Sequence, residues 1–528
     1  MSSDRSWDAV VIGTGFGGST VALQLAKAGM SVLVLERGRW VDRDDSAWST
    51  RAIHIDQKYR GHTPYEADES KLEGLVYPNH TVGGNSIFYG AASFRLRVDD
   101  FGRRSRFGDA SSDGDFVDWP FAYEELAPYY EQAERRLGVV GLGGMDPTEP
   151  PRGSDYIGAP PPYASPAKRV VQAGTKLGLR PFPIPLAINF NGGNGRAASR
   201  CVKCLTCDMF PCKIGAKNDL SIAVLPDAIR HGAVIKDQVT ATKLLWTGGR
   251  VTGVEYLDLR DGQTVTVSCD VAVVSGGAIG SARLLLASGL GEMEPNGRLV
   301  GRYLMRHCSG IVVGFFPSRT NPEGQFHKQV AITDFYFGGP NGGRPAGPWG
   351  MIQSLQVPPP EFLKTTPFPV NVIGPRSYER NIFLMCIAED VPQLDNRVTL
   401  HPTKHDQYGQ RIAKVRYSHH RDDLMRRRAL FREAVRVMRK TGAWAWVRIP
   451  VNTFSHALGT CRSGTDPAKA VLDPSCRFFG LSNLFVADAS FMPTAGAVNP
   501  SLTIAANGLR VGEHIANHWA DITRPSRT

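Results

Sequence analysis

The sequence predicts an α/β fold: a Rossmann-like nucleotide-binding domain joined to a second, substrate-binding domain built on an antiparallel sheet. Two observations carry this prediction. A strand, a glycine-rich turn, a helix and a second strand follow one another at the start of the chain, which is the order of a β-α-β unit. Further along, residues 311–417 mix alternating apolar positions with Pro and Gly breaks, a pattern typical of antiparallel strands.

The turn in the first unit has the features of a dinucleotide-binding site. Gly13, Gly15 and Gly18 form a G-x-G-x-x-G pattern between the strand and the helix. The first glycine permits the tight turn, the second lets the backbone approach a pyrophosphate, and the third allows close helix–strand packing. Glu36 ends the second strand, where a carboxylate can accept hydrogen bonds from ribose hydroxyls. The pattern predicts dinucleotide binding without separating FAD from NAD.

The remaining elements are predicted from apolar periodicity and from turn residues. We expect strands at residues 8–12, 31–35, 253–257, 264–268, 271–275, 330–337, 381–386 and 484–487. We expect helices at residues 19–28, 123–137, 280–290, 421–441 and 500–519. Residues 39–80 and 140–165 are predicted to be irregular.

The bulk composition excludes several classes of protein. The net charge is +11, yet no nucleic-acid-reading motif accompanies it, so we expect no nucleic-acid partner and a solvated face on the basic helix at 421–440. There is no basic-then-apolar leader and no apolar run of about 18 residues. We therefore expect a cytoplasmic protein without a membrane partner. Nine cysteines in 528 residues do not make a disulfide framework.

Candidate catalytic residues lie near the end of the chain. An apolar strand there ends in Asp488-Ala489-Ser490, and Asn499-Pro500 precedes a helix. Asn is a good N-cap, Pro suits the first helical position, and the helix N-terminus could stabilise a developing anion. The residues alone leave open whether His456 is catalytic or a satisfied core histidine, and whether Asn499 is more than a cap.

The order of these segments resembles the glucose-methanol-choline (GMC) oxidoreductase family over most of the chain. The Gly301–His307 segment (GRYLMRH) is similar to the family's short G-x-x-L-x-x-H segment. The resemblance is strongest in four places: residues 8–38, Val82-Gly83-Gly84-Asn85-Ser86, residues 277–291 (GAIGSARLLLASGLG) and residues 456–510.

The resemblance implies FAD as the cofactor, with His456 of the H-x-x-G-T segment and Asn499 as the two catalytic positions at the flavin. Ile87-Phe88 stand where covalent members carry a histidine, and His80 lies upstream, so we expect non-covalent FAD. Tyr89 replaces the family's usual Asn or His. The implied cofactor contacts are Gly13, Gly15, Phe16, Gly17, Gly18, Glu36, Arg37, Gly83, Gly84, Asn85, Ser86, Val239, Asp488, Ala489, Asn499, Pro500, Ser501, Leu502 and Thr503.

The reaction implied by this resemblance is oxidation of a CH–OH group to a carbonyl by hydride transfer to flavin. His456 would accept the hydroxyl proton, because imidazole has a free pKa of about 6.5, and Asn499 would hydrogen-bond the same oxygen. The substrate stays open among sugars, polyols, aminocyclitols, sterols and other alcohols, and the electron acceptor is oxygen or another molecule. The alternatives are an NAD-dependent dehydrogenase and a flavin-containing lyase on the same fold.

The resemblance also divides the chain into two domains. We expect residues 1–100, 195–310 and 451–528 to form the discontinuous FAD-binding domain. Residues 101–194 and 311–450 would form the substrate-binding cap.

A cysteine-dense loop stands apart from these motifs. Cys201, Cys204, Cys207 and Cys212 follow one another closely, and C-x-x-C spacing suits thiolate ligands of zinc or of an iron–sulfur cluster. The iron–sulfur run usually has three residues before a Cys-Pro, whereas here four residues intervene and Pro211 precedes the last cysteine. We expect structural thiols and no metal, with a bound metal or cluster as the alternative.

Overall fold

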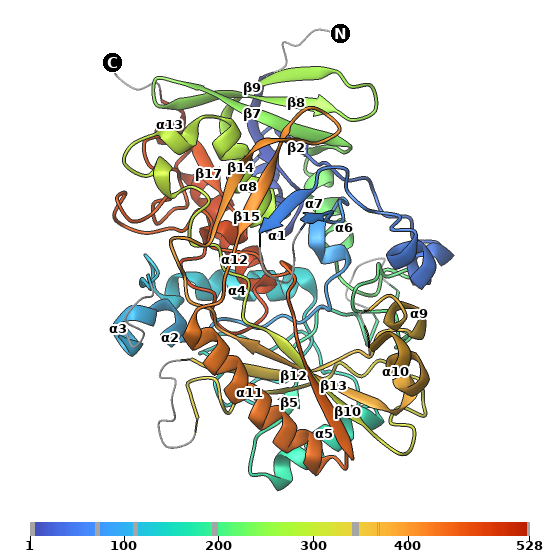
Figure 1. Cartoon of the computed structure of the whole chain (residues 1–528). Coiled ribbons are helices and arrows are strands. Elements are labelled where there is room, and N and C mark those ends of the chain that lie inside the picture. Colours follow the sequence, from blue (N-terminus) through green and yellow to red (C-terminus); the bar gives the residue numbers. More distant parts are fainter. Residues whose placement is uncertain are drawn as a thin grey trace.

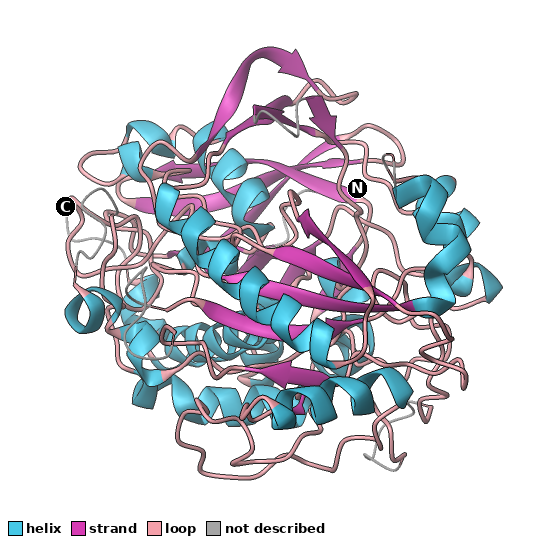
Figure 2. Cartoon of the chain, turned by 60° about the horizontal axis from the view of Figure 1, so that its bottom comes forward, coloured by secondary structure: helices cyan, strands magenta, loops and turns pink. Residues whose placement is uncertain are grey.

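The computed structural model contains three β-sheets with helices packed around them, which is the α/β class that the sequence predicts. The seven-stranded sheet lies in the upper part of Figure 1 and the six-stranded sheet in the lower part. Figure 2 brings the lower end forward and shows helices crossing over the strands there. The structure describes residues 6–68, 74–108, 115–192, 199–339, 348–366, 368 and 370–524.

The seven-stranded sheet has the order β6-β2-β1-β9-β8-β7, with β17 also paired to β9. The pairs of β1 with β2 and β9, of β2 with β6 and of β9 with β17 are parallel. Every residue of β2 and β17 is buried, as expected for parallel strands that are covered on both faces. The bounds are β1 Ser6–Ile12, β2 Val32–Leu35, β6 Val234–Lys236, β7 Val239–Thr247, β8 Arg250–Asp258, β9 Thr264–Val274 and β17 Leu484–Val486.

The first and last long helices of the chain pack against each other beside this sheet. They are α1 (Phe16–Lys27) and α12 (Ser501–Asn517). A Cβ atom at Gly508 of α12 would lie 2.1 Å from Oγ1 of Thr20 in α1, so the absence of a side chain there permits this close approach. The contact brings the C-terminal motifs next to the N-terminal glycine turn.

The six-stranded sheet is antiparallel, in the order β16-β10-β13-β12-β11-β5. One face packs against α5 (Ser165–Lys176) and α11 (Arg421–Lys440) through a shared apolar core. The other face contributes Ala331, Met351 and Ile387 to the large core that continues into the seven-stranded sheet. The bounds are β5 Phe182–Pro183, β10 Gly310–Phe315, β11 Val330–Ile332, β12 Gly350–Leu355, β13 Asn381–Ala388 and β16 Ala445–Pro450.

A third, four-stranded sheet has the order β14-β15-β3-β4. Its strands are β3 Tyr65–Asp68, β4 Gly74–Val76, β14 Arg397–His405 and β15 Arg411–Arg416. The other α-helices are α2 Val98–Phe101, α3 Arg103–Phe107, α4 Tyr123–Leu137, α6 Leu220–Ala223, α7 Leu225–Arg230, α8 Gly277–Ala287, α9 Pro360–Leu363, α10 Val370–Ser377 and α13 Trp519–Thr523. Short 3-10 or π turns lie at Asp45–Trp48, Arg51–Ile55, Gly84–Ile87, Leu290–Glu292, Gly297–Leu299, Tyr378–Arg380 and Ala489–Phe491.

Several element predictions were wrong in detail. The segment 39–80 is not irregular throughout, because it contains β3, β4 and two helical turns. The strand expected at 330–337 ends at Ile332, and residues 334–337 form a turn. Phe335 and Tyr336 are buried, while Phe337 is exposed. The two strands expected at 264–268 and 271–275 are one continuous strand, β9. None of the described helices combines the length and the apolar character that a bilayer span requires.

Candidate active site

The glycine-rich turn between β1 and α1 has the geometry that a pyrophosphate needs. Gly13 has φ of 104°, a value that favours glycine. Cβ atoms at Gly17 and Gly18 would lie 1.3 Å from the carbonyl oxygen of Ala487 and 2.0 Å from that of Gly13. A Cβ at Gly15 would meet no atom within 4 Å, and no side chain caps the N-terminus of α1 there. The turn is therefore packed on one side and open at the helix N-terminus, where anions bind.

A second glycine turn faces this opening. Gly83 and Gly84 both have positive φ, and a Cβ at Gly84 would lie 3.1 Å from Cα of Gly15. The Thr14 hydroxyl accepts a hydrogen bond from the Gly83 amide at 2.8 Å. Ser86 is buried and donates to the Gly83 carbonyl at 2.6 Å, whereas the Asn85 side chain is exposed. The two predicted cofactor loops are thus brought together, and phosphate or sugar groups would lie between them.

Glu36 closes the turn from the end of β2. Its Oε2 accepts hydrogen bonds from the amide (2.9 Å) and the hydroxyl (2.5 Å) of Thr14, and its Oε1 accepts from the Gly38 amide at 2.7 Å. Burial raises the pKa of Glu36, and these hydrogen bonds oppose that rise. The Val239 amide donates to the Glu36 carbonyl at 2.9 Å. Arg37 is half-buried beside it, and burial lowers its pKa. Glu36, Arg37 and Val239 therefore lie together, as the cofactor prediction requires.

Asp488 joins the end of β17 to two helix N-termini. Its Oδ2 accepts from the Gly277 amide at 2.8 Å and from the Ser281 hydroxyl, and its Oδ1 accepts from the amide (2.9 Å) and the hydroxyl (2.5 Å) of Ser490. Burial raises the pKa of Asp488. The next carbonyl, of Ala489, accepts from the Gly459 amide at 3.1 Å. This last bond places the H-x-x-G-T segment against the nucleotide-binding sheet.

The histidine of that segment contacts a second histidine, His307, which was not among the predicted site residues. The Nδ1 atoms of His456 and His307 lie 3.0 Å apart, with the rings at 86° to each other. His307 is buried, and its Nε2 lies 3.2 Å from the carbonyl oxygen of Ala495. Burial lowers the pKa of His307, and burial with the nearby charge of Lys328 and the His307 ring lowers that of His456 to about 3. The GRYLMRH segment that contains His307 was the sequence signal for it.

Asn499 lies just before the start of α12, but it is not the helix cap. The helix begins at Ser501, its N-cap is Pro500, and no side chain caps it, so the predicted cap and first helical position were one residue early. Oδ1 of Asn499 is buried and has no hydrogen-bond partner among the described residues. Such an atom is costly to leave unpaired, which fits a ligand at this point. Leu502 and Thr503 are buried in the first turn, and Thr503 bonds the Tyr130 hydroxyl.

The cysteine loop lies against the second glycine loop without assembling a metal site. No His, Cys, Asp or Glu group in the described ranges is placed to hold a metal ion, and the nine cysteines are free. Burial raises the pKa of Cys201 to about 11 and that of Cys207 further, so both are neutral thiols at neutral pH in the metal-free protein. The Lys217 ammonium donates to the carbonyls of Tyr89, Cys207 and Phe210, which holds the loop in place.

The cysteine loop also contributes one member of a buried ion pair, Asp208. Nζ of Lys328 donates to Oδ1 of Asp208 at 2.9 Å, with both side chains at least nine-tenths buried. A Cβ at Gly90, next to Tyr89, would lie within 2 Å of both charged groups. Oδ2 of Asp208 is buried and lacks a hydrogen-bond partner within the part of the chain that is described. No sequence pattern indicates this pair, because its members are 120 residues apart.

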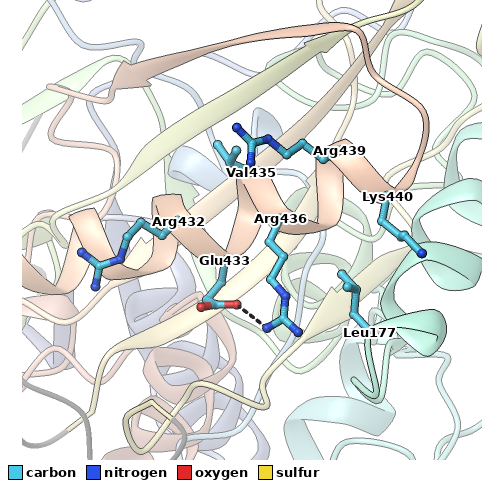
Figure 3. A pocket seen from close by; sticks show the side chains of 7 residues that line it. All are labelled: Leu177, Arg432, Glu433, Val435, Arg436, Arg439 and Lys440. Carbon is cyan, nitrogen blue, oxygen red and sulfur yellow. Dashed lines mark hydrogen bonds and ion pairs between the residues drawn. The ribbon is translucent and has the colours of Figure 1, made fainter.

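A surface hollow of about 490 Å³ lies elsewhere, between α11 and the end of α5, and it contains none of the predicted site residues (Figure 3). The predicted residues instead converge where the two glycine loops, the H-x-x-G-T segment and the N-terminus of α12 meet. The open helix N-terminus, the unpaired Asn499 oxygen and the engaged carboxylates make a site that fits a flavin dinucleotide beside two histidines.

Comparison with known proteins shows which family this chain resembles. Residues 78–309 and 392–508 match the two sequence models described as GMC oxidoreductase, and residues 8–139 match one described as FAD dependent oxidoreductase. The chain is 34% identical to 6'''-hydroxyparomomycin C oxidase of Streptomyces lividus (98% of this chain, 93% of that protein). It is 34% identical to paromamine 6'-oxidase of Streptomyces fradiae (98% and 94%).

Proteins of lower sequence identity are also similar over nearly the whole chain. The chain is 28% identical to 2-methyl-1,2-propanediol dehydrogenase of Mycolicibacterium austroafricanum (99% of this chain, 97% of that protein). The crystal structure of pyridoxine 4-oxidase from Mesorbium loti superposes with a TM-score of 0.67, at 20% identity, over 97% of this chain and 99% of that one. This last likeness shows that the two chains share a fold.

Proposed function

Because this chain belongs to the GMC oxidoreductase family and is therefore an FAD-dependent enzyme that oxidises CH–OH groups, we propose that His456 is the base that accepts the substrate's hydroxyl proton. Asn499 holds the same oxygen through its side-chain amide. The observation that carries the proposal is the hydrogen bond between His456 and His307, which leaves one nitrogen of His456 for the substrate. Bound FAD supplies the acceptor for the hydride that leaves the carbon.

The contacts of the two histidines support Nε2 as the basic nitrogen of His456. A carbonyl oxygen only accepts hydrogen bonds, so the contact of His307 Nε2 with Ala495 places the proton of neutral His307 on Nε2. Its Nδ1 is then an acceptor, and Nδ1 of His456 must donate to it. Nε2 of His456 consequently carries no proton and can receive one from the substrate.

A lowered pKa does not prevent this role. With a pKa of about 3, His456 is fully neutral at neutral pH and ready to accept a proton, although it is a weak base. As a hydride leaves the carbon, the hydroxyl proton becomes strongly acidic, so a weakly basic imidazole suffices. The uncapped N-terminus of α12 adds a positive dipole end that stabilises negative charge developing nearby.

FAD is held by the residues that line the two glycine loops, by Glu36, Arg37 and Val239 at one end, and by Asp488 to Thr503 at the other. Its attachment is non-covalent, because Ile87-Phe88 offer no nucleophile in the loop. Residues 1–100, 195–310 and 451–528 form the cofactor-binding domain, and residues 101–194 and 311–450 shape the substrate side.

The substrate is a small polyhydroxylated molecule such as a sugar or aminocyclitol. The Asp208–Lys328 pair offers an acceptor and a donor side by side in a buried place, which matches two adjacent hydroxyl groups of one ring. Lys328 is one cause of the lowered pKa of His456, which supports placing the pair on the substrate side of the base. The relatives that share 34% of their residues with this chain are oxidases of paromamine-type molecules by name.

The proposal is tested by anaerobic mixing of the purified, FAD-loaded protein with a panel of sugars, aminocyclitols, sterols and long-chain alcohols while the flavin absorbance is followed. Bleaching by a polyhydroxylated substrate is expected. His456→Ala should slow the bleaching by at least about 10²-fold, and the exposed His231→Ala serves as the matched control with an unchanged rate. Wild-type bleaching by His456→Ala would refute the role of this residue.

The same preparation separates the alternatives. A flavin absorbance band that substrate bleaches excludes both an NAD-dependent dehydrogenase and a lyase in which the flavin is only structural. Acid precipitation should release all the flavin into the supernatant if it is non-covalent. Consumption of oxygen during turnover distinguishes oxygen from another electron acceptor.

A further inference from the structure

The exposed face of α11 carries charges of one sign. The helix has two acidic residues in its first turn, Asp422 and Asp423, and both are buried. Glu433 is half-buried and pairs with Arg436 at 3.4 Å. Each exposed position of this 20-residue helix is a cation: Arg421, Arg428, Arg432, Arg436, Arg439 and Lys440.

The fold does not need these cations where they are. Four of them, Arg428, Arg432, Arg436 and Lys440, follow one another at intervals of four residues, so each is the helix-surface neighbour of the next and repels it. The helix is held on the sheet by its opposite face, through residues such as Leu430 and Phe431. A solvated face without a partner usually mixes both signs. A single-sign stripe about 18 Å long therefore points to an anionic ligand.

The neighbouring helix extends the stripe into a surface. α5 packs beside α11, exposes Lys168 and Lys176, and contains no acidic residue. Between the two helices lies the hollow of about 490 Å³ described above. Figure 3 shows its basic side chains around the Glu433–Arg436 ion pair. Its lining is Leu177, Arg432, Glu433, Val435, Arg436, Arg439 and Lys440.

Apolar side chains border the cations. Directly after α11, the indole of Trp444 is 70% exposed. Trp446 lies under the guanidinium of Arg439, 4.5 Å from it. Exposed indoles beside Arg and Lys are typical of surfaces that enter the headgroup layer of a membrane. No nucleic-acid-reading motif accompanies the cations.

We propose that α11, the C-terminal end of α5 and the start of β16 form a basic face that binds the anionic surface of a lipid bilayer. Because the apolar side of α11 is already packed on the sheet, attachment is electrostatic, with Trp444 entering the headgroups, and it is reversible and weakened by salt. Figure 1 places α11 and α5 at the end of the molecule opposite both termini and the seven-stranded sheet. Attachment would therefore leave the cofactor-binding end exposed to solvent.

The test is flotation of the full-length, FAD-loaded protein with vesicles of phosphatidylcholine alone or with about one third phosphatidylglycerol. Binding is expected only to the anionic vesicles, and it should be lost when salt is raised from about 0.02 M to about 0.5 M. Each cation near the surface contributes about fivefold in affinity. The variant Arg432→Gln, Arg436→Gln, Arg439→Gln, Lys440→Gln should thus bind roughly a hundredfold more weakly or worse. Its melting temperature should be unchanged or higher, since like-charge repulsion is removed.

The matched control makes the same change in net charge on other elements, with Arg51, Arg106, Arg230 and Arg298 each changed to Gln. It should keep wild-type vesicle binding. Trp444→Ala should weaken vesicle binding several-fold and leave retention on duplex DNA unaltered. The proposal is overturned if the wild type ignores anionic vesicles at low salt, if the control loses as much as the basic-face variant, or if DNA binds more tightly than vesicles at equal salt.

Discussion

His307→Gly isolates the part that the second histidine plays in the reaction. His307 has φ of 63°, a conformation that most residues avoid and that glycine adopts freely. The change therefore keeps the backbone and removes the Nδ1 atom that accepts the hydrogen bond from His456. His456 itself is unchanged, but it loses the hydrogen bond that keeps its proton on Nδ1.

The expected loss follows from the strength of that bond. A hydrogen bond of 3.0 Å between neutral groups is worth about 0.5–1.5 kcal/mol net. At about 1.4 kcal/mol per tenfold in rate, flavin reduction should slow by about two- to thirteenfold. This loss is well short of the 10²-fold or more expected for removing the base, and FAD affinity should not change.

Two measurements check this reasoning. Anaerobic stopped-flow at the flavin absorbance gives the rate of reduction, and NMR of the protein with ¹⁵N-labelled histidine shows which nitrogen of His456 carries the proton. We expect a single Nδ1–H tautomer in the wild type and a mixture in His307→Gly. Our assignment would be wrong if the wild type showed Nε2–H, or if His307→Gly reduced its flavin at the wild-type rate with an altered tautomer.

Four further predictions concern proton uptake, the cofactor, the substrate and the cysteines. Flavin reduction should be independent of pH from about 8 down to about 5, because the pKa of His456 is about 3; an inflection near 6.5 that disappears in His456→Ala would contradict this. Since unfolded His456 takes up a proton below about 6.5 and the folded residue does not, urea titrations should show stability falling as the pH drops through that window. Gly15→Ala should weaken FAD binding without lowering the melting temperature of the apoprotein, whereas Gly17→Ala, whose Cβ would lie 1.3 Å from a carbonyl oxygen, should destabilise the fold; equal melting temperatures would count against the packing argument. Asp208→Asn should raise KM for a polyhydroxylated substrate by about tenfold or more while sparing a simple primary alcohol, and equal losses on both would remove Asp208 from the substrate site. Metal analysis should find no stoichiometric iron or zinc on Cys201–Cys212, and chelators should leave activity intact; one bound cluster per chain would reverse this.

Local patterns predicted the elements whose signals are contained within a few turns of chain. The strand–turn–helix at Gly13 to Gly18 was found because glycine is required at each close approach, and α4 was found at its observed bounds. The four-stranded sheet escaped prediction because β3 and β4 are short and because β3 pairs with β15, more than 300 residues away. The apolar pattern within residues 39–80 contains no information about a partner strand that far away in the sequence. Tyr336 was assigned to a strand because of the apolar alternation at residues 330–337, but the strand ends at Ile332 and the Tyr336 hydroxyl donates to Asp100.

The candidate site was predicted unevenly for a similar reason. His456 and Asn499 came from the family resemblance, since an isolated histidine or asparagine has no local signature. His307 stood in a segment that had been recognised, yet its role depends on a hydrogen bond to a residue 149 positions later. Asp208 lies inside the cysteine-dense loop, where the C-x-x-C spacing and not the aspartate indicated a possible site. Contacts between segments far apart in the chain decide these roles, and sequence spacing does not record them.

The hydrogen bonds separate two kinds of polar side chain at this site. Glu36 and Asp488 have both carboxylate oxygens engaged by amides and hydroxyls of the chain, so they hold the loops whether or not a ligand is bound. Asn499 and Asp208 each keep a buried oxygen that no described residue satisfies. An unpaired buried oxygen is costly, and a donor on a bound ligand would remove that cost at these two positions. Substitution of Glu36 or Asp488 should therefore lower the stability of the apoprotein. Substitution of Asn499 should mainly change binding, whereas substitution of Asp208 should change both binding and stability, because its Oδ1 also accepts from the buried Lys328 ammonium.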